Sequence, residues 1–108
     1  IERMSQMYKS GGHSIFPTEI EQAICRHPDV AMAAVLGVED ELFGEVGYAF
    51  VMPKKCTGLT ERSLDEFLRH QIANFKVPKT IQLLTTMPLL ANTKVDKQAL
   101  KDMLNGNS

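Results

Sequence analysis

Three stretches of the chain carry apolar residues at spacings of three and four, which predicts three helices that each present one face to a core. In chain order these faces comprise Ile20, Ala23 and Ile24; Leu64, Phe67, Leu68 and Ile72; and Val95, Ala99, Leu100, Met103 and Leu104.

Residues at the ends of these stretches indicate where each helix begins. Pro17 suits a first helical turn, and Thr18 with Glu21 has the spacing of a capping box. Thr60 predicts the start of the second helix, with Ser63 as its polar companion. Before the third helix, positions 92 and 93 hold Asn and Thr, which are turn and N-cap residue types.

Between the helical stretches lie short segments with the composition of strands. Residues 30–38, 46–52 and 80–84 are rich in β-branched, aromatic or small apolar residues, and the first two are close enough in sequence to pair antiparallel. Near the amino end, Gly11 and Gly12 predict the turn of a β-hairpin. The pattern therefore predicts an α+β fold: a small mixed three-stranded sheet flanked by helices, with an N-terminal β-hairpin.

Composition restricts the function classes. The 108 residues are 44% hydrophobic and 23% charged with a formal net charge of -1, which fits one globular domain and argues against a nucleic-acid binder. No apolar run approaches the roughly 18 residues of a membrane span. Cys25 and Cys56 form no CxxC motif, and His13, His27 and His70 share no ligand spacing. We therefore expect no metal site, idle thiols and a cytoplasmic protein.

Three features could carry chemistry: Lys94 on a polar loop, the turn at residues 9–12, and Phe75 with Lys76 and Lys79. None places a nucleophile beside a base, so no catalytic triad is predicted. Lysine is a mobile charge for phosphate, glycine admits a close ligand, and an exposed aromatic ring can stack on a base. The residues alone therefore predict a domain that handles a phosphate-bearing ligand.

Several segments together resemble one enzyme superfamily. They are Arg3–Glu21 with its Lys-Ser-Gly-Gly turn, His27-Pro28-x-Val30, Gly37-Val38, Gly44-Glu45, the Asn-Phe-Lys-Val-Pro-Lys segment at 74–79 and Asn92-Thr93-Lys94-Val95-Asp96-Lys97. In order and spacing, they resemble the small C-terminal lid domain of the adenylate-forming enzymes. That superfamily comprises acyl-CoA synthetases, peptide-synthetase adenylation domains and beetle luciferases.

The resemblance implies a reaction in two steps. A carboxylic acid and Mg-ATP first give an acyl-adenylate and pyrophosphate. The lid then rotates, and the thiol of coenzyme A or of a carrier-protein pantetheine takes the acyl group. Because the chain begins at Ile1 rather than at a methionine, we expect residues 1–108 to be a fragment of a two-domain enzyme, with 105–108 as a frayed tail. The N-terminal domain would hold the carboxylate pocket and most of the ATP site.

The resemblance also implies roles for individual residues. Lys94 matches the lysine that contacts the carboxylate and the α-phosphate during adenylation, and Lys9 matches a lysine presented to the site after rotation. Arg3 matches an arginine that meets the nucleotide near the hinge, which lies at Ser5. The residues expected to line the pantetheine tunnel or touch coenzyme A are Gly11, Gly12, Phe75 and Lys79.

The chain departs from the family pattern at two places. Thr93 stands where the family usually has glycine before the lysine, and a β-branched residue resists a positive φ there. Ser5 and Gln6 replace the charged residues usual at the hinge, where permissive backbone angles matter more than charge.

Three functions remain open from the sequence. The first is the C-terminal domain of an ATP-dependent acyl-CoA ligase, inactive in isolation. The second is the lid of a peptide-synthetase adenylation domain, which passes its acyl group to a carrier protein. The third is a non-catalytic interaction domain that has kept the fold.

Overall fold

A computed structural model of the chain describes residues 7–42, 44–55, 57–92 and 94–104. The described strands are β1 (Tyr8–Ser10), β2 (His13–Ile15), β3 (Val30–Asp40), β4 (Gly44–Pro53) and β5 (Thr80–Leu83). The helices among the described residues are α1 (Pro17–Cys25), α2 (Glu61–Arg69) and α3 (Lys97–Leu104), with a 3₁₀ turn at Asn74–Lys76.

The long strands β3 and β4 form the centre of the sheet. They pair antiparallel from Val30↔Pro53 to Asp40↔Gly44, as their closeness in sequence predicts. β5 pairs with β4 in parallel, so the sheet is mixed, and the hairpin β1–β2 joins through Ser10↔Gly44. The predicted α+β fold is confirmed, and the structure adds that the hairpin and the other three strands form one five-stranded sheet.

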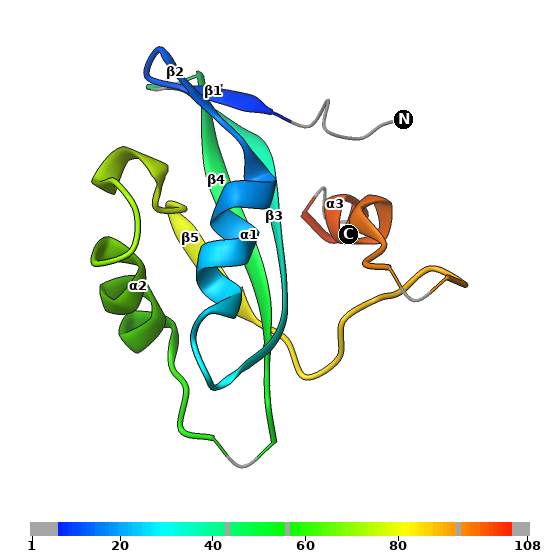
Figure 1. Cartoon of the computed structure of the whole chain (residues 1–108). Coiled ribbons are helices and arrows are strands. Elements are labelled where there is room, and N and C mark those ends of the chain that lie inside the picture. Colours follow the sequence, from blue (N-terminus) through cyan, green and yellow to red (C-terminus); the bar gives the residue numbers. More distant parts are fainter. Residues whose placement is uncertain (1–6, 43, 56, 93, 105–108) are drawn as a thin grey trace.

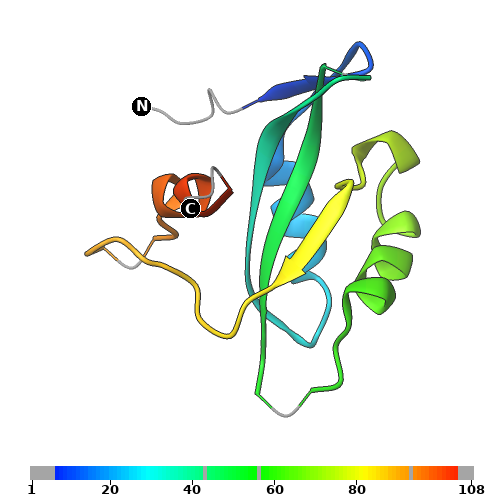
Figure 2. The same ribbon diagram turned by 180° about the vertical axis from the view of Figure 1, so that it is seen from behind.

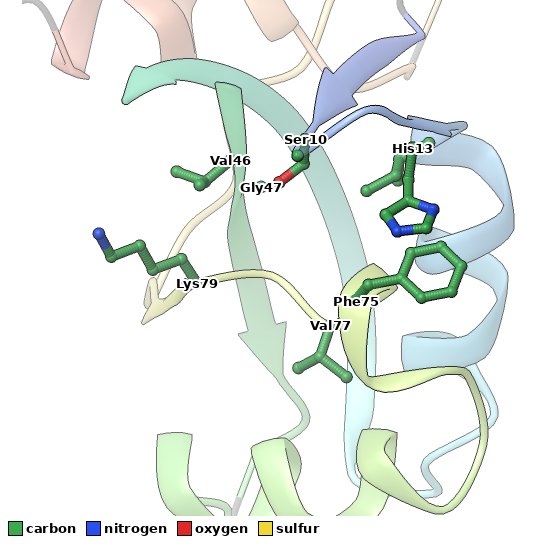
Figure 3. Close-up of a pocket in the computed structure, with 9 residues that line it drawn as sticks. Ser10, His13, Val46, Gly47, Phe75, Val77 and Lys79 are labelled. Carbon is green, nitrogen blue, oxygen red and sulfur yellow. The ribbon is translucent and has the colours of Figure 1, made fainter. Parts of the chain in front are cut away.

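One edge of β4 is shared by two strands. β3 occupies the whole of one edge, so β1 and β5 both pair with the other: β1 at Gly44, and β5 from Tyr48 to Val51. Figure 2 shows the hairpin at one end of β4 and β5 farther along it. Between them lies the pocket drawn in Figure 3.

The helices cover both faces of the sheet. α1 and α2 lie on one face and α3 on the other (Figure 1). The strands alternate accordingly, because successive side chains point to opposite faces. In β4, Ala49 and Val51 pack with the core under α1 and α2, while Tyr48 and Phe50 face α3. The sequence prediction that Tyr48 and Phe50 share one face is confirmed.

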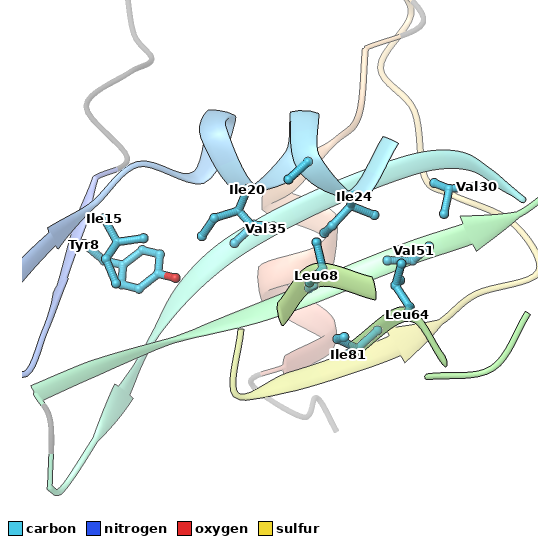
Figure 4. Close-up of a cluster of buried hydrophobic side chains, with 12 residues drawn as sticks. Tyr8, Ile15, Ile20, Ile24, Val30, Val35, Val51, Leu64, Leu68 and Ile81 are labelled. Atoms are coloured by element: carbon cyan, nitrogen blue, oxygen red, sulfur yellow. The ribbon is translucent and has the colours of Figure 1, made fainter. Parts of the chain in front are cut away.

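The larger core lies between the sheet and helices α1 and α2 (Figure 4). Its buried residues are Tyr8, Ile15, Ile20, Ala23, Ile24, Val30, Val35, Ala49, Val51, Leu64, Leu68 and Ile81. The smaller core, beneath α3, comprises Ala34, Phe50, Met87 and Leu100.

The predicted starts of α1 and α2 are confirmed, but only one of the two predicted caps is. Thr60 caps α2, since its side chain accepts a hydrogen bond from the Ser63 backbone N–H, and Ser63 reciprocates. The capping box of Thr18 with Glu21 is wrong: the N-cap of α1 is Phe16, which makes no side-chain cap hydrogen bond. Pro17 fills the first turn as expected, and Glu21 has other partners, described below.

The start of α3 lies later than the sequence predicts. Asp96, rather than position 92 or 93, acts as the cap: its carboxylate accepts the Ala99 N–H at 3.0 Å, and its carbonyl accepts the Leu100 N–H. Position 93 lies outside the described residues. Lys94 therefore belongs to a loop that ends before the helix begins.

Candidate functional site

The loop that carries Lys94 is closed at its base by backbone pairing. Leu89 and Val95 form an isolated antiparallel bridge, and the Leu90 N–H donates to the Lys94 carbonyl at 2.7 Å. Within the loop, the Lys94 N–H donates to the Asn92 carboxamide oxygen at 3.2 Å, an Asx-turn contact. These bonds fix the backbone of Lys94.

The side chain of Lys94 is exposed. A further backbone bond, from the Asp96 N–H to the Pro88 carbonyl at 2.9 Å, ties the loop to the start of α3. The arrangement presents a cation on a held loop, as the sequence predicts. The effect of Thr93 on that loop stays a prediction, because position 93 lies outside the described residues.

The hairpin β1–β2 turns at two glycines in left-handed conformations. Gly11 has a φ of 59° and Gly12 a φ of 88°, so the turn needs positive φ at both central positions, which favours glycine. Lys9 lies on β1 with its side chain exposed, and its backbone N–H donates to the Glu45 carboxylate at 3.1 Å.

The pocket between the hairpin and the segment before β5 has a volume of about 400 Å³. It is lined by Ser10, Gly11, His13, Ile15, Val46, Gly47, Phe75, Val77 and Lys79. The Lys79 N–H donates to the Gly47 carbonyl at 2.9 Å, which attaches the 75–79 segment to β4. Most of the lining residues are apolar or glycine, and Lys79 places a cation at the rim of the pocket (Figure 3).

Two rings stack at this pocket. The imidazole of His13 and the ring of Phe75 lie 4.1 Å apart between centroids at an interplanar angle of 21° (Figure 3). Phe75 remains 46% exposed, so ring surface is left for another group. The sequence prediction missed His13, because a single histidine beside a turn carries no pattern. Only the pairing of the hairpin with β4 brings it to Phe75.

The lysines near Phe75 are held by carboxylates. Lys76 Nζ lies 2.8 Å from Glu19 Oε2 and 5.9 Å from the Phe75 ring centroid, and Lys79 Nζ lies 3.1 Å from Asp40 Oδ1. Lys79 is the more exposed cation, at 60% against 27% for Lys76, and is thus the freer to meet an anion.

The structure brings some of the predicted residues together and leaves others apart. Gly11 from the hairpin and Phe75 and Lys79 from the 75–79 segment line one pocket. Lys94 is not among its lining residues and lies on the loop before α3. Arg3 and Ser5 lie outside the described residues.

Tyr8 is buried and packs against Gly47, one of the residues that line the pocket. Its ring covers Gly37 and Gly47, which pair with each other across β3 and β4. Burial, with a smaller effect from the Glu45 carboxylate, raises the pKa of Tyr8 from 10.0 to about 12. The hydroxyl therefore stays protonated at neutral pH and is a packing group rather than a base.

Residues 7–42, 44–55, 57–92 and 94–104 contain no group of three His, Cys, Asp or Glu side chains that could hold a metal ion. No helix among them has the length and apolarity to cross a membrane.

Similarity to known protein families shows which family the chain belongs to. The sequence profile of the AMP-binding enzyme C-terminal domain matches residues 19–94. The chain belongs to this family. The chain is thus a small C-terminal domain of the adenylate-forming superfamily, as its motifs predict.

Relatives of this AMP-binding C-terminal domain are CoA ligases. It is 41% identical over 102 residues to 3-[(3aS,4S,7aS)-7a-methyl-1,5-dioxo-octahydro-1H-inden-4-yl]propanoyl:CoA ligase of Mycobacterium tuberculosis, covering 94% of this chain and 20% of that protein. It is 38% identical over 104 residues to 2-succinylbenzoate--CoA ligase of Geobacillus kaustophilus, covering 96% and 21%. Among solved structures it is similar to ATP-bound MatB from Rhodopseudomonas palustris, with a TM-score of 0.88, 31% identity and coverage of 96% and 21%. The chain thus spans about a fifth of the length of these relatives.

Proposed function

We propose that the chain acts as the C-terminal domain of an AMP-forming acid–thiol ligase, which activates a carboxylate as an acyl-adenylate and transfers it to coenzyme A. The observation that carries the proposal is the exposed Lys94 on a bonded loop, in a domain whose relatives are CoA ligases. The carboxylic acid, ATP and its Mg²⁺ would bind mainly to an N-terminal domain of the same enzyme.

In the first half-reaction, Lys94 stabilises negative charge. As the carboxylate attacks the α-phosphate, charge develops on the phosphate oxygens and on the departing pyrophosphate. A cation held by its backbone in the right place stabilises that charge without reorganising, and loss of one such group costs roughly 10²–10³-fold in rate. Arg3 contacts the nucleotide and Ser5 is the hinge residue in this proposal.

In the second half-reaction, the hairpin and its pocket receive the thiol cofactor. Gly11 and Gly12 leave the turn without side chains, so that the pantetheine arm can pass close to the backbone. Phe75 offers ring surface for the adenine of coenzyme A, His13 supports the other side of that ring, and Lys79 is the exposed cation for a phosphate. Lys9 approaches the reacting groups from the same hairpin.

The test of the adenylation role uses the full-length enzyme that contains this chain, with Lys94→Ala assayed in the two half-reactions separately. Carboxylate-dependent pyrophosphate release should fall roughly 10²–10³-fold, while thioester formation from a supplied acyl-adenylate stays near wild type. Lys55→Ala, an exposed lysine beyond the end of β4, is the matched control. An unchanged pyrophosphate release would favour a non-catalytic domain.

The choice of acceptor has its own test. The CoA ligase names of the relatives favour coenzyme A over a carrier protein, and the aromatic pair suits an adenine, which a carrier-bound pantetheine lacks. Phe75→Ala and His13→Ala should therefore raise the KM for coenzyme A but leave that for free pantetheine unchanged. Equal effects on both thiols would show that the rings do not contact the adenine and would remove this argument for coenzyme A.

A further inference from the structure

An ion pair at the open edge of the sheet joins helices that lie on its two faces. Glu21 on α1 lies beside β3, the strand at the open edge, and its Oε2 accepts the Val35 backbone N–H at 2.8 Å. The same oxygen lies 2.7 Å from Nζ of Lys97, which comes from α3 on the opposite face. Both side chains are largely buried, with 19% exposure for Glu21 and 26% for Lys97.

The position of Lys97 is unfavourable without this partner. Lys97 is the first residue of α3, where the helix dipole disfavours a positive charge. The Glu21 carboxylate compensates that charge and also accepts the Val35 N–H at the open edge of β3. A bond shared by a strand edge and a helix start fixes the direction in which α3 leaves its loop.

The apolar contacts of α3 lie beyond its first turn. Leu100 is the buried residue of the helix, and Leu104 at its other end packs partly buried against the same core. Among the described residues, the other hydrogen bonds of α3 are internal or made to its own cap, Asp96. Lys97 thus attaches the start of α3 to the sheet edge through a polar contact.

The attachment lies close in sequence to the candidate adenylation lysine. Lys97 follows Lys94 by three residues. Asp96 lies between them: its N–H donates to the Pro88 carbonyl in the Lys94 loop, and its carboxylate accepts the Ala99 N–H of α3. A shift of α3 on the sheet therefore moves the loop with it. Gly11 and Gly12, in contrast, lie on the hairpin β1–β2, which joins the sheet through the pairing of Ser10 with Gly44 on β4.

We propose that the Glu21–Lys97 ion pair is a positioning device that sets the Lys94 loop for the adenylation half-reaction. The inference rests on the proposed function of Lys94. Neither residue touches the substrate in this view; both act through the placement of α3. A misplacement of about 1 Å in a catalytic group can cost on the order of 10²-fold in rate, so loss of the pair should be visible in kcat.

The test compares variants of the full-length enzyme in the two half-reactions. Lys97→Met and Glu21→Gln should each lower kcat of pyrophosphate release about tenfold or more, with little change in the KM for ATP. Thioester formation from a supplied acyl-adenylate should stay near wild type. Glu21→Gln keeps an oxygen that can accept the Val35 N–H, so it separates the charge from the edge hydrogen bond. Lys101→Met, on an exposed position of the same helix, is the control and should change neither rate.

Two variants separate positioning from general stability. Lys97→Arg keeps the cation and should retain most of the adenylation rate. The double variant Glu21→Gln/Lys97→Met should be no slower than either single variant, because both remove one interaction. An adenylation rate that is unchanged in Lys97→Met, or two half-reactions that fall together, would overturn the inference.

The Lys94→Ala variant distinguishes this inference from the proposed function on which it rests. If Lys94→Ala abolishes pyrophosphate release while Lys97→Met leaves it intact, the proposed function stands and the positioning role fails. If Lys94→Ala has no effect, both fail.

Discussion

At the scale of single residues, the most demanding contact is the ring of Tyr8 on paired glycines. A Cβ on Gly37 would lie 2.5 Å from Tyr8 Cβ, and one on Gly47 would meet the Tyr8 hydroxyl and lie 3.1 Å from Pro78 Cα. Distances below 3 Å force atoms to move. Because both positions are glycine, the buried ring of Tyr8 can pack directly on the backbones of β3 and β4 beside the pocket.

Gly47→Ala tests this contact. We expect the free energy of unfolding to fall by about 1–3 kcal/mol, the usual cost of overpacking, since neither the Tyr8 ring nor the Pro78 backbone can yield freely. Urea denaturation of the chain measures the change. Gly58→Ala is the control, because nothing lies within 4 Å of its added methyl group. A Gly47 variant as stable as the Gly58 variant would contradict the packing described here.

The raised pKa of Tyr8 predicts a stability change in alkali. Unfolding returns its pKa from about 12 to the ordinary 10.0. Between these pH values the unfolded chain loses the phenolic proton while the folded chain keeps it, so stability falls as pH rises. The contribution is fully present below pH 10 and is lost towards pH 12. Tyr8→Phe should flatten the slope of unfolding free energy against pH in this window; an unchanged slope would show that other groups cause it.

At the scale of elements, α3 has the fewest buried residues of the three described α-helices. Leu100 is its fully buried side chain and packs with Phe50, Ala34 and Met87. Burial of Leu100 therefore supplies the energy that holds the helix on the sheet, whereas the Lys97 ion pair sets the direction of the helix.

Leu100→Ala should consequently destabilise the chain by about 2–5 kcal/mol, because it removes buried methyl groups and leaves a cavity in a small cluster. Met103→Ala on the same helix is the control, since Met103 is 49% exposed and should change stability by less than about 0.5 kcal/mol. Thermal unfolding of both variants measures the difference. Similar losses for the two would mean that α3 is not anchored through Leu100.

Sequence pattern predicts these elements unequally well. The Thr60–Ser63 cap follows from local chemistry and is confirmed, as are the hairpin turn and the antiparallel pairing of β3 with β4. The capping box at Glu21 is wrong because tertiary partners, the Val35 N–H and Lys97, compete for that carboxylate. Such partners lie 14 residues or more away and leave no local pattern.

At the scale of the whole molecule, sheet order determines which candidate residues meet. The sequence predicts Gly11, Phe75 and Lys79 as candidates, but it cannot place them in one pocket. That depends on β1 and β5 sharing one edge of β4, a pairing between segments far apart in the chain. His13 enters the site by the same route.

The same arrangement argues that the isolated chain is inactive. Its candidate groups lie on two separated surfaces, the hairpin pocket and the Lys94 loop, and each presents a cation outward rather than enclosing a substrate. The proposed adenylation needs a carboxylate, ATP and Lys94 in one geometry, which this surface alone does not supply. We therefore expect no carboxylate-dependent pyrophosphate release from the 108-residue chain under conditions where the full-length enzyme turns over. Activity in the isolated chain that also disappears in Lys94→Ala would contradict the two-domain requirement and place the whole reaction on this domain.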